Sequence, residues 1–187
     1  MQKYSVIVAD PPWQFKVWNR DTGQGRSAEA HYRTMTIADI CAMPIPDLAE
    51  KNCALFLWCV WPSIFDFVPR LLAAWGFKYK TCAFMWVKAK KSGMGHFTGM
   101  GYYTRANSEP CLLAVRGSMP VVSHSVSQIV YSPVRKHSQK PDVYDLIERL
   151  YPAGKRLELF ARQPWPGWDR WGNEVEGGID MTEYSKF

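Results

Sequence analysis

The sequence lacks long apolar runs, internal repeats and low-complexity segments. No uninterrupted apolar stretch among its 187 residues approaches the roughly 20 that a membrane-spanning helix needs, so we predict no membrane segment. Residues 1–5 lead directly into an apolar run and show no signal-peptide pattern, which predicts a cytoplasmic protein. The length suits one domain, which we expect to span residues 1–187.

Cysteine is scarce and follows no ligand pattern. The five cysteines form no Cys-x-x-Cys pair, and neither they nor the four histidines show the spacing of metal ligands. Cys53 and Cys59 instead flank an apolar run, as buried thiols in a reducing compartment would. Gly-x-Gly-x-x-Gly is also absent after every strand-like run, which disfavours a dinucleotide-binding oxidoreductase. We therefore predict no metal site.

Positive charge and aromatic rings are what the sequence has in excess. The formal net charge is +6, and aromatic residues make up 14% of the chain. A positive protein favours polyanionic partners because it neutralises phosphates. Aromatic rings outside the core are available to stack on flat ligands such as bases. Both features favour nucleic acid as a partner.

Apolar runs alternate with amphipathic segments along the chain. We predict strands over residues 4–9, 53–59, 77–87, 111–115, 128–131 and 157–160. We predict helices opening at Thr36, over 62–75 with a bend at Pro69, and over 141–151, followed by an irregular tail from Gln163. This alternation predicts an α/β protein with a single, mainly parallel, doubly wound sheet. Long loops over 14–34 and 88–106 are expected on the substrate side, beyond the carboxyl ends of the strands.

The segment Asp10-Pro11-Pro12-Trp13 follows the first predicted strand, where a ligand site is expected. Its prolines lack an N–H and fix φ, so the Asp10 carboxylate and the carbonyls of Asp10 and Pro11 form a rigid array of acceptors. Such an array suits an amine with two hydrogens, such as N6 of adenine, whose lone pair could then attack an activated methyl group. Trp13 could stack on the base. The same residues could instead be a proline-rich strand end with a helix-capping Asp and a core Trp.

The segment Val8-Ala9-Asp10-Pro11-Pro12-Trp13 resembles the signature of the MT-A70 family of N6-adenine methyltransferases. Further segments resemble that family in the same order along the chain: Tyr32-Arg33-Thr34-Met35, Leu55-Phe56-Leu57-Trp58, Phe84-Met85-Trp86-Val87-Lys88, Glu109-Pro110-Cys111-Leu112 with Arg116-Gly117, Lys140-Pro141-Asp142 through Ile147-Glu148-Arg149-Leu150, Glu158-Leu159-Phe160-Ala161-Arg162 and Gly172-Asn173-Glu174. The resemblance is nearer to the bacterial and phage branch than to the eukaryotic subunits, which carry long appended domains. It implies a Rossmann-like class I methyltransferase fold, circularly permuted, with helices on both faces of the sheet and S-adenosyl-L-methionine as methyl donor.

The resemblance also implies roles for individual residues. The catalytic loop that binds the target amine and borders the base would be Asp10, Pro11, Pro12 and Trp13. The residues near that base would be Tyr32 and Glu109. The cofactor would be contacted by Asp10, at its methionine carboxylate by Lys140, and at its adenosine end by Phe160, Arg162, Asn173 and Glu174, the last in place of the family's Gln. Each also has a structural reading, such as a solvated Lys140 at a helix start or a surface ion pair between Arg162 and Glu109.

The predicted loop 88–106 carries basic residues among glycines and aromatic rings. This pattern suits a loop that grips a phosphate backbone and stacks bases, so we expect substrate contacts from Lys88, Lys90, Lys91 and Arg105. The alternative is a solvated loop with no binding role. The segment Arg135-Lys136-His137 is a second basic candidate.

Several alternatives stay open from the sequence. An adenine in a duplex must be flipped out of the stack before its N6 can enter such a site. We expect DNA as the substrate, with RNA as the alternative, and a homo- or heterodimer as the alternative to a monomer. Methylation of another amine more often uses Asn or Ser in place of Asp10, and a catalytically inactive nucleic-acid-binding subunit typically loses Asp10 or Trp13.

Overall fold

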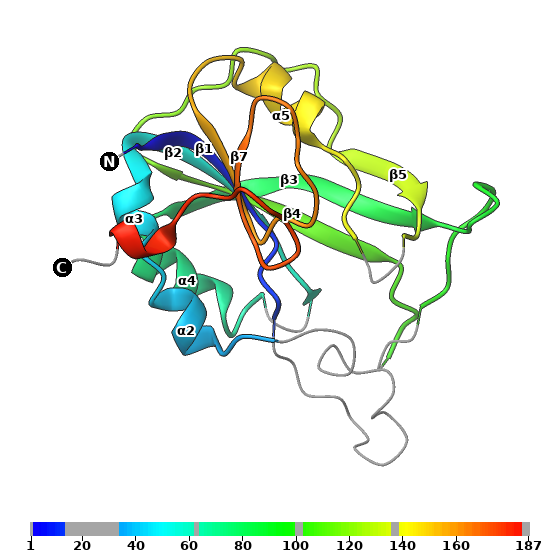
Figure 1. Cartoon of the computed structure of the whole chain (residues 1–187). Coiled ribbons are helices and arrows are strands. Elements are labelled where there is room, and N and C mark those ends of the chain that lie inside the picture. Colours follow the sequence, from blue (N-terminus) through cyan, green and yellow to red (C-terminus); the bar gives the residue numbers. More distant parts are fainter. Residues whose placement is uncertain (1, 14–33, 62–63, 100–102, 136–138, 185–187) are drawn as a thin grey trace.

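The protein is described by a computed structural model, which covers residues 2–13, 34–61, 64–99, 103–135 and 139–184 (Figure 1). In chain order its elements are β1 Tyr4–Ala9, α2 Ile37–Cys41, α3 Ile45–Leu48, β2 Ala49–Trp58, α4 Val68–Trp75, β3 Lys78–Ala89, β4 Ser108–Arg116, β5 Ile129–Pro133, α5 Tyr144–Leu150, β6 Arg156–Leu159, β7 Asp169–Trp171 and the 3-10 helix η5 Met181–Tyr184. The predicted loop 14–34 falls almost entirely outside the described residues, and so does Tyr32. No helix in the described ranges is long and apolar enough to cross a bilayer.

The described strands form one sheet of seven, in the order β5-β3-β4-β2-β1-β6-β7. The interior strand β1 pairs in parallel with β2 on one side and β6 on the other, and β6–β7 and β3–β5 are also parallel. Only β4 runs the other way, antiparallel to both β2 and β3. The predicted mainly parallel sheet is therefore confirmed, and its parallel strands direct their carboxyl ends to one edge.

Helices cover both faces of the sheet, as predicted (Figure 1). Side chains alternate across β1, because successive residues of a strand point to opposite faces. Ile7 and Ala9 belong to the core cluster that includes buried residues of α2, α3 and α4. Val6 and Val8 belong to a second cluster, on the face covered by α5. Val6 and Val8 thus point towards α5.

The predicted helix over 62–75 is wrong at its start. α4 begins at Val68, so Pro69 lies in the first helical turn, where a missing N–H breaks no hydrogen bond. Pro69 therefore starts the helix and does not bend it. Gly76 ends the helix with a left-handed φ of 75°, as expected of a glycine cap. The last predicted helix also begins later, at Tyr144 instead of Pro141.

Several strand boundaries differ from the prediction. β7 was not predicted, because a three-residue strand is too short to show a period; it exists through its pairing with β6, from Leu157 with Asp169 to Leu159 with Trp171. β2 begins earlier than predicted, at Ala49. β3 extends to Ala89, so Lys88 belongs to a strand and the predicted loop 88–106 begins only at Lys90. The helix start at Thr36 is confirmed, with the Asp39 amide donating to Thr36 Oγ1 over 3.1 Å.

Candidate active site

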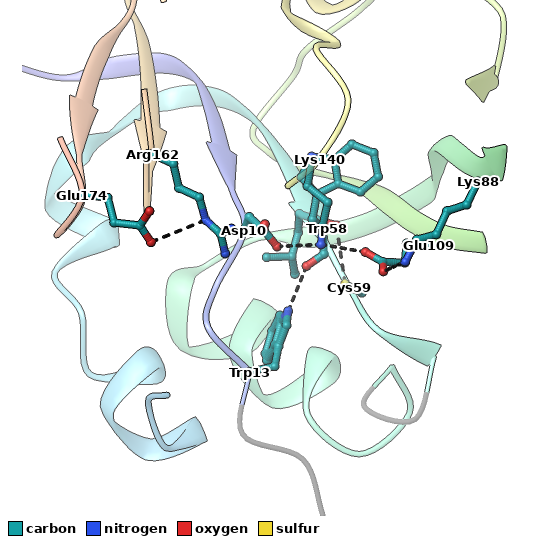
Figure 2. A network of polar contacts seen from close by, with 10 residues as sticks. Asp10, Trp13, Trp58, Cys59, Lys88, Glu109, Lys140, Arg162 and Glu174 are labelled. Carbon is teal, nitrogen blue, oxygen red and sulfur yellow. Dashed lines mark hydrogen bonds and ion pairs between the residues drawn. The ribbon is translucent and has the colours of Figure 1, made fainter. Parts of the chain in front are cut away.

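Polar side chains from several elements gather where the parallel strands end (Figure 2). Asp10 follows β1 directly, and Lys140 lies in the segment before α5. Glu109 is the second residue of β4. Because β4 is antiparallel to its neighbours, its first residues lie at the same edge as the carboxyl ends of the other strands. The topology therefore brings Asp10, Glu109 and Lys140 together from distant parts of the sequence.

These side chains form a row of alternating charges. Lys140 Nζ lies 3.4 Å from Asp10 Oδ1 and 2.6 Å from Glu109 Oε2. Glu109 also forms an ion pair with Lys88. The side chains of Lys88, Glu109 and Lys140 are 12–14% exposed, and that of Asp10 is 24% exposed. Figure 2 shows these four side chains in the spatial order Asp10, Lys140, Glu109 and Lys88. The ring of Trp58 lies beside the Lys140 cation.

The pKa values in this row follow from burial and pairing. Burial alone would raise the pKa of Glu109, but Lys140 and Lys88 more than offset it, and the pKa is lowered. Burial would lower the pKa of Lys140, yet Asp10 and Glu109 outweigh it, and the pKa is raised. Asp10 differs, because burial dominates and raises its pKa while Lys140 offsets only part. Lys140 is thus a permanent cation between two carboxyl groups, of which Asp10 is the easier to protonate.

The geometry of the Asp-Pro-Pro-Trp segment favours an acceptor array at Asp10 and Pro11. The carbonyl of Pro11 accepts the Trp13 amide over 2.8 Å, and that of Pro12 accepts the Met35 amide over 3.0 Å. A carbonyl oxygen has two lone pairs, so Pro11 keeps one for a ligand. The Asp10 carboxylate pairs with Lys140.

Trp13 has a different place from the one that the sequence suggests. Its side chain is 4% exposed and packs in the core cluster below β1. Its indole N–H donates to the carbonyl of Trp58 over 3.0 Å. In this position Trp13 anchors the loop to β2, as in the core reading of the motif. Stacking of Trp13 on a base stays a prediction, and it would require the ring to leave this packing.

A pocket opens beside Asp10, between the ends of β1 and β6 and the segment before α5. Its lining includes Asp10, Trp58, Lys140, Glu158, Phe160 and Arg162. The structure therefore brings the predicted cofactor residues Asp10, Lys140, Phe160 and Arg162 to one cavity.

Phe160, at the end of β6, has a strained backbone. Its φ is +63°, a left-handed conformation that costs a residue other than glycine about 1–3 kcal/mol. The ring meets Trp171 edge-to-face, with centroids 5.4 Å apart. This contact from β7 holds the Phe160 ring at the pocket while its backbone turns sharply away from the strand.

A close backbone contact places the predicted residues Asn173 and Glu174. A Cβ at Gly172 would lie 2.2 Å from the Ala161 carbonyl oxygen, so only glycine fits there. This approach brings the exposed Asn173 and Glu174 past the end of β6, and Glu174 Oε1 lies 3.8 Å from Arg162 Nε. Arg162 thus pairs with Glu174, and the alternative surface pair between Arg162 and Glu109 is wrong.

The predicted substrate residues divide into two groups. Lys88 lies on β3 and its largely buried side chain pairs with Glu109, so it does not belong to the predicted loop 88–106, and its contact with substrate stays a prediction. Lys90, Lys91 and Arg105 are exposed and remain predicted substrate contacts. The first two lie on a tight turn in which the Lys90 amide donates to the Gly95 carbonyl over 3.0 Å.

In the second basic segment, Arg135-Lys136-His137, Arg135 has a structural role. Arg135 donates to both carboxylate oxygens of Asp142, over 3.1 and 2.9 Å, and to the Lys140 carbonyl over 3.3 Å. This bidentate pair fixes the segment that carries Lys140 and leaves Arg135 less available to a phosphate. Lys136 and His137 lie outside the described residues.

Sequence reasoning missed three residues near the site. Trp58 packs beside the Lys140 cation, with 6.0 Å from Nζ to the ring centroid. Trp61 is 47% exposed, and its indole donates to Ser108 Oγ over 3.4 Å, next to Glu109. Glu158 lines the pocket. The sequence could have indicated it, because it is an acid within an apolar strand, two residues before Phe160. Among the described residues, no cluster of three or more His, Cys, Asp or Glu could hold a metal ion.

The sheet, the helices on both faces and the charged pocket at the carboxyl edge define the class as a Rossmann-like α/β fold of the methyltransferase type. A family model described as MT-A70 matches residues 4–174, and the chain belongs to this family. The resemblance in the sequence is therefore confirmed.

Three relatives illustrate the match. The type II methyltransferase M.MunI of Mycoplasma sp is 33% identical over 191 residues, which span 93% of this chain and 78% of that protein. The human N(6)-adenosine-methyltransferase catalytic subunit METTL3 is 30% identical over 180 residues, or 94% of this chain and 29% of that protein. An N(6)-adenosine-methyltransferase MT-A70-like protein of Arabidopsis thaliana is 29% identical, with 24% of its length covered. The chain thus spans most of the Mycoplasma protein but less than a third of the other two.

Proposed function

We propose that this chain transfers the methyl group of S-adenosyl-L-methionine to the exocyclic N6 amine of adenine in nucleic acid, with DNA as the polymer. The observation that carries the proposal is the position of Asp10, which lies between a rigid loop of acceptors and a pocket containing a buried cation. Membership of the MT-A70 family and relatives named N(6)-adenosine-methyltransferases support the same reaction.

The residues around Asp10 suit the target amine. The Asp10 carboxylate and the free lone pair of the Pro11 carbonyl accept the two N–H groups of N6. This draws the nitrogen towards a tetrahedral geometry and frees its lone pair. Holding the amine in one orientation lowers the entropic part of the barrier. No strong base is required, because the methylated nitrogen carries an acidic proton that passes to water.

The pocket fits the chemical groups of the methyl donor. When bound, S-adenosyl-L-methionine supplies an electrophilic methyl group on a sulfonium sulfur. Lys140 is a compact cation that suits the methionine carboxylate. The ring of Phe160 and the side chain of Arg162 line the pocket and suit an adenosine group. Asn173 and Glu174 are exposed and lie outside the pocket lining, and their contact with the adenosine group is a proposal from the family resemblance alone. The orphaned acceptor of Glu158 is a further sign that the pocket is built for a polar ligand.

The exposed surface near the site suits a nucleic acid. Lys90, Lys91 and Arg105 supply exposed cations that can neutralise phosphates. Trp61 is an exposed ring next to Ser108 and Glu109, where a flipped or unpaired base could stack. We infer DNA because the chain nearly fills the length of the relative named a type II methyltransferase. RNA is the second candidate, favoured by the relatives named N(6)-adenosine-methyltransferases.

The experiment is methyl transfer from labelled S-adenosyl-L-methionine to single- and double-stranded DNA and RNA oligonucleotides. The wild type is expected to form N6-methyladenine in DNA, and Asp10→Asn to lose at least about 1,000-fold in rate, because the amine loses a charged acceptor. Asp47→Asn, which removes an exposed acid on α3, is the matched control and should keep full activity. Methylation of neither polymer, or full activity of Asp10→Asn, would contradict the proposal, and methylation of RNA alone would replace DNA with RNA.

A further inference from the structure

Two exposed aromatic rings lie on the turn between β2 and α4, of which Trp61 and residues 64–67 are described. Phe65 is 85% exposed and Trp61 is 47% exposed. Their neighbours Ile64 and Phe67 pack against the core cluster that contains Trp13. These packed residues hold the turn in place, while the Phe65 ring stays in solvent. A single exposed apolar residue is ordinary, but here two rings occupy one turn.

The sheet places this turn beside the candidate active site. β2 lies between β1 and β4, so the chain leaves β2 between Asp10, which follows β1, and Glu109, near the start of β4 (Figure 2). The Trp61 indole donates to Ser108 Oγ, the residue before Glu109, over 3.4 Å. The turn that carries Phe65 therefore starts at the rim of the site, between the two acids.

The chemistry of the turn favours contact with stacked bases over contact with phosphates. The Phe65 side chain has no polar atom, so it can contact a nucleic acid only through its apolar ring. Residues 64–67 include the exposed acid Asp66 and no cation, so the turn does not attract a phosphate. Apolar side chains of this kind insert between base steps and take over part of the lost stacking. An adenine that leaves a duplex opens such a gap.

We propose that Phe65 enters the base stack of double-stranded DNA and fills the place of the adenine that has turned into the site. The inference rests on the proposed function and adds to it the means by which a duplex is held open. Phe65 is thus a positioning residue, because it contacts the polymer and not the reacting atoms. A single strand has no paired stack to hold open, so the contribution of Phe65 is specific to the duplex.

The test compares a duplex with its separated strands. DNA of mixed sequence is methylated in both forms by the wild type, Phe65→Ala and Phe65→Leu. We expect Phe65→Ala to lower the ratio of duplex to single-strand kcat/KM by about 10-fold or more, since the stacking of one ring is lost. Phe65→Leu keeps an apolar wedge and should retain most of the ratio. An unchanged ratio in Phe65→Ala would overturn the proposal, and so would a wild type that methylates single strands alone.

Tyr79→Ala is the matched control. Tyr79 is also an exposed ring, with 56% exposure. It lies near the start of β3, whose other end pairs with the first residues of β4, so it is at the edge of the sheet opposite the site. Tyr79→Ala should therefore leave the ratio unchanged. Sedimentation completes the comparison: a dimeric wild type with a monomeric Phe65→Ala would mean that a second copy covers the ring, and would overturn the proposal.

A fluorescent base provides a second measurement, which requires no methyl transfer. The analogue 2-aminopurine brightens when it is unstacked, and it replaces the target adenine that the methylated products identify. Saturating wild type should raise its fluorescence in the duplex, and saturating Phe65→Ala should raise it less. An equal rise for both proteins would contradict the inference. Failure of the wild type to methylate either form of DNA, or RNA, would instead contradict the proposed function itself.

Discussion

The charged residues of the site differ sharply between the pocket and the turn that follows β3. At the pocket and beside it, Asp10, Lys140, Glu109 and Lys88 are largely buried and pair in a row. On the turn, Lys90 and Lys91 are exposed to solvent, although Lys88 is only two positions away. The proposed reacting end is thus built on the ends of strands and held by mutual contacts. The cations of the proposed polymer-binding end lie on an exposed turn.

The same type of substitution should therefore have different consequences in the two regions. A buried charge that loses its partner remains desolvated, so the cost falls on folding. An exposed cation that is removed costs only its attraction to phosphate, and salt screens that attraction.

The largest effect is expected at Lys140. Lys140→Met leaves the largely buried Asp10 without its cation and Glu109 with Lys88 alone, and it should lower the free energy of unfolding by about 3–5 kcal/mol. Chemical denaturation measures this change, and Lys91→Met is the matched exposed control, with less than about 0.5 kcal/mol expected. Adding Glu109→Gln to Lys140→Met should restore part of the loss. Equal changes in the free energy of unfolding for Lys140→Met and Lys91→Met would contradict the distinction between the pocket and the turn.

A substitution at Gly172 tests whether the region of the pocket also depends on close backbone packing. Gly172→Ala places a methyl group against the Ala161 carbonyl and should cost about 3 kcal/mol, because backbone must move. Gly167→Ala is the control, since its left-handed φ of 77° strains an alanine but no atom lies within 4 Å of the added carbon. Thermal denaturation should rank Gly172→Ala as the more damaging. The displacement of residues 172–174 should also weaken binding of S-adenosyl-L-methionine, measured by calorimetry.

Glu158 should make stability depend on pH. Its pKa is raised from 4.5 to about 7 by burial and neighbouring acids, so the folded protein binds a proton that the unfolded chain releases. Wild-type stability should therefore decrease as pH rises from 4.5 through about 7. Melting temperatures across this range should show a shallower decrease for Glu158→Gln. An identical pH profile of the variant would mean that Glu158 keeps an ordinary pKa in the folded state.

The smallest effect on stability is expected for the turn. Lys90→Ala combined with Lys91→Ala should leave the melting temperature nearly unchanged, since both side chains are exposed. Affinity for an oligonucleotide should fall, and the slope of log affinity against log salt should decrease by about 0.7–0.9 for each phosphate that is no longer neutralised. Binding titrations at several salt concentrations provide the slope. An unchanged slope would assign the turn no role in phosphate binding.

Local patterns allowed the elements with strong signals to be predicted. β1 has the predicted bounds, and the Thr36 cap is correct, because an apolar run before a proline pair and an N-cap residue are determined within a few positions. The start of α4 and the existence of β7 were wrong or missed. Both depend on tertiary packing, since Pro69 is compatible with a bend or a helix start and β7 exists only through pairing with β6.

The candidate site divides in a similar way. Asp10, Lys140, Phe160 and Arg162 were selected by resemblance, and the structure places all four at one pocket. The burial of Lys88 could not be predicted, because its pair with Glu109 depends on the register between β3 and β4, where Trp86 faces Glu109. Glu158 was overlooked for a related reason. An acid in a strand is ordinary until the neighbouring strand and helix show that its oxygen is buried.

The pairing of β1 with β6 has a consequence for the synthesis of the protein. β1, which leads into Asp10, is made before the other described strands of the sheet, but β6, which supplies the other wall of the pocket, is made after all of them except β7. The contact closes a very long loop, and such non-local pairings are slow to form. A nascent chain that lacks β6 therefore lacks one wall of the proposed methyl-donor pocket, however well the earlier strands have folded. The proposed catalytic loop is thus made long before the pocket beside it can close.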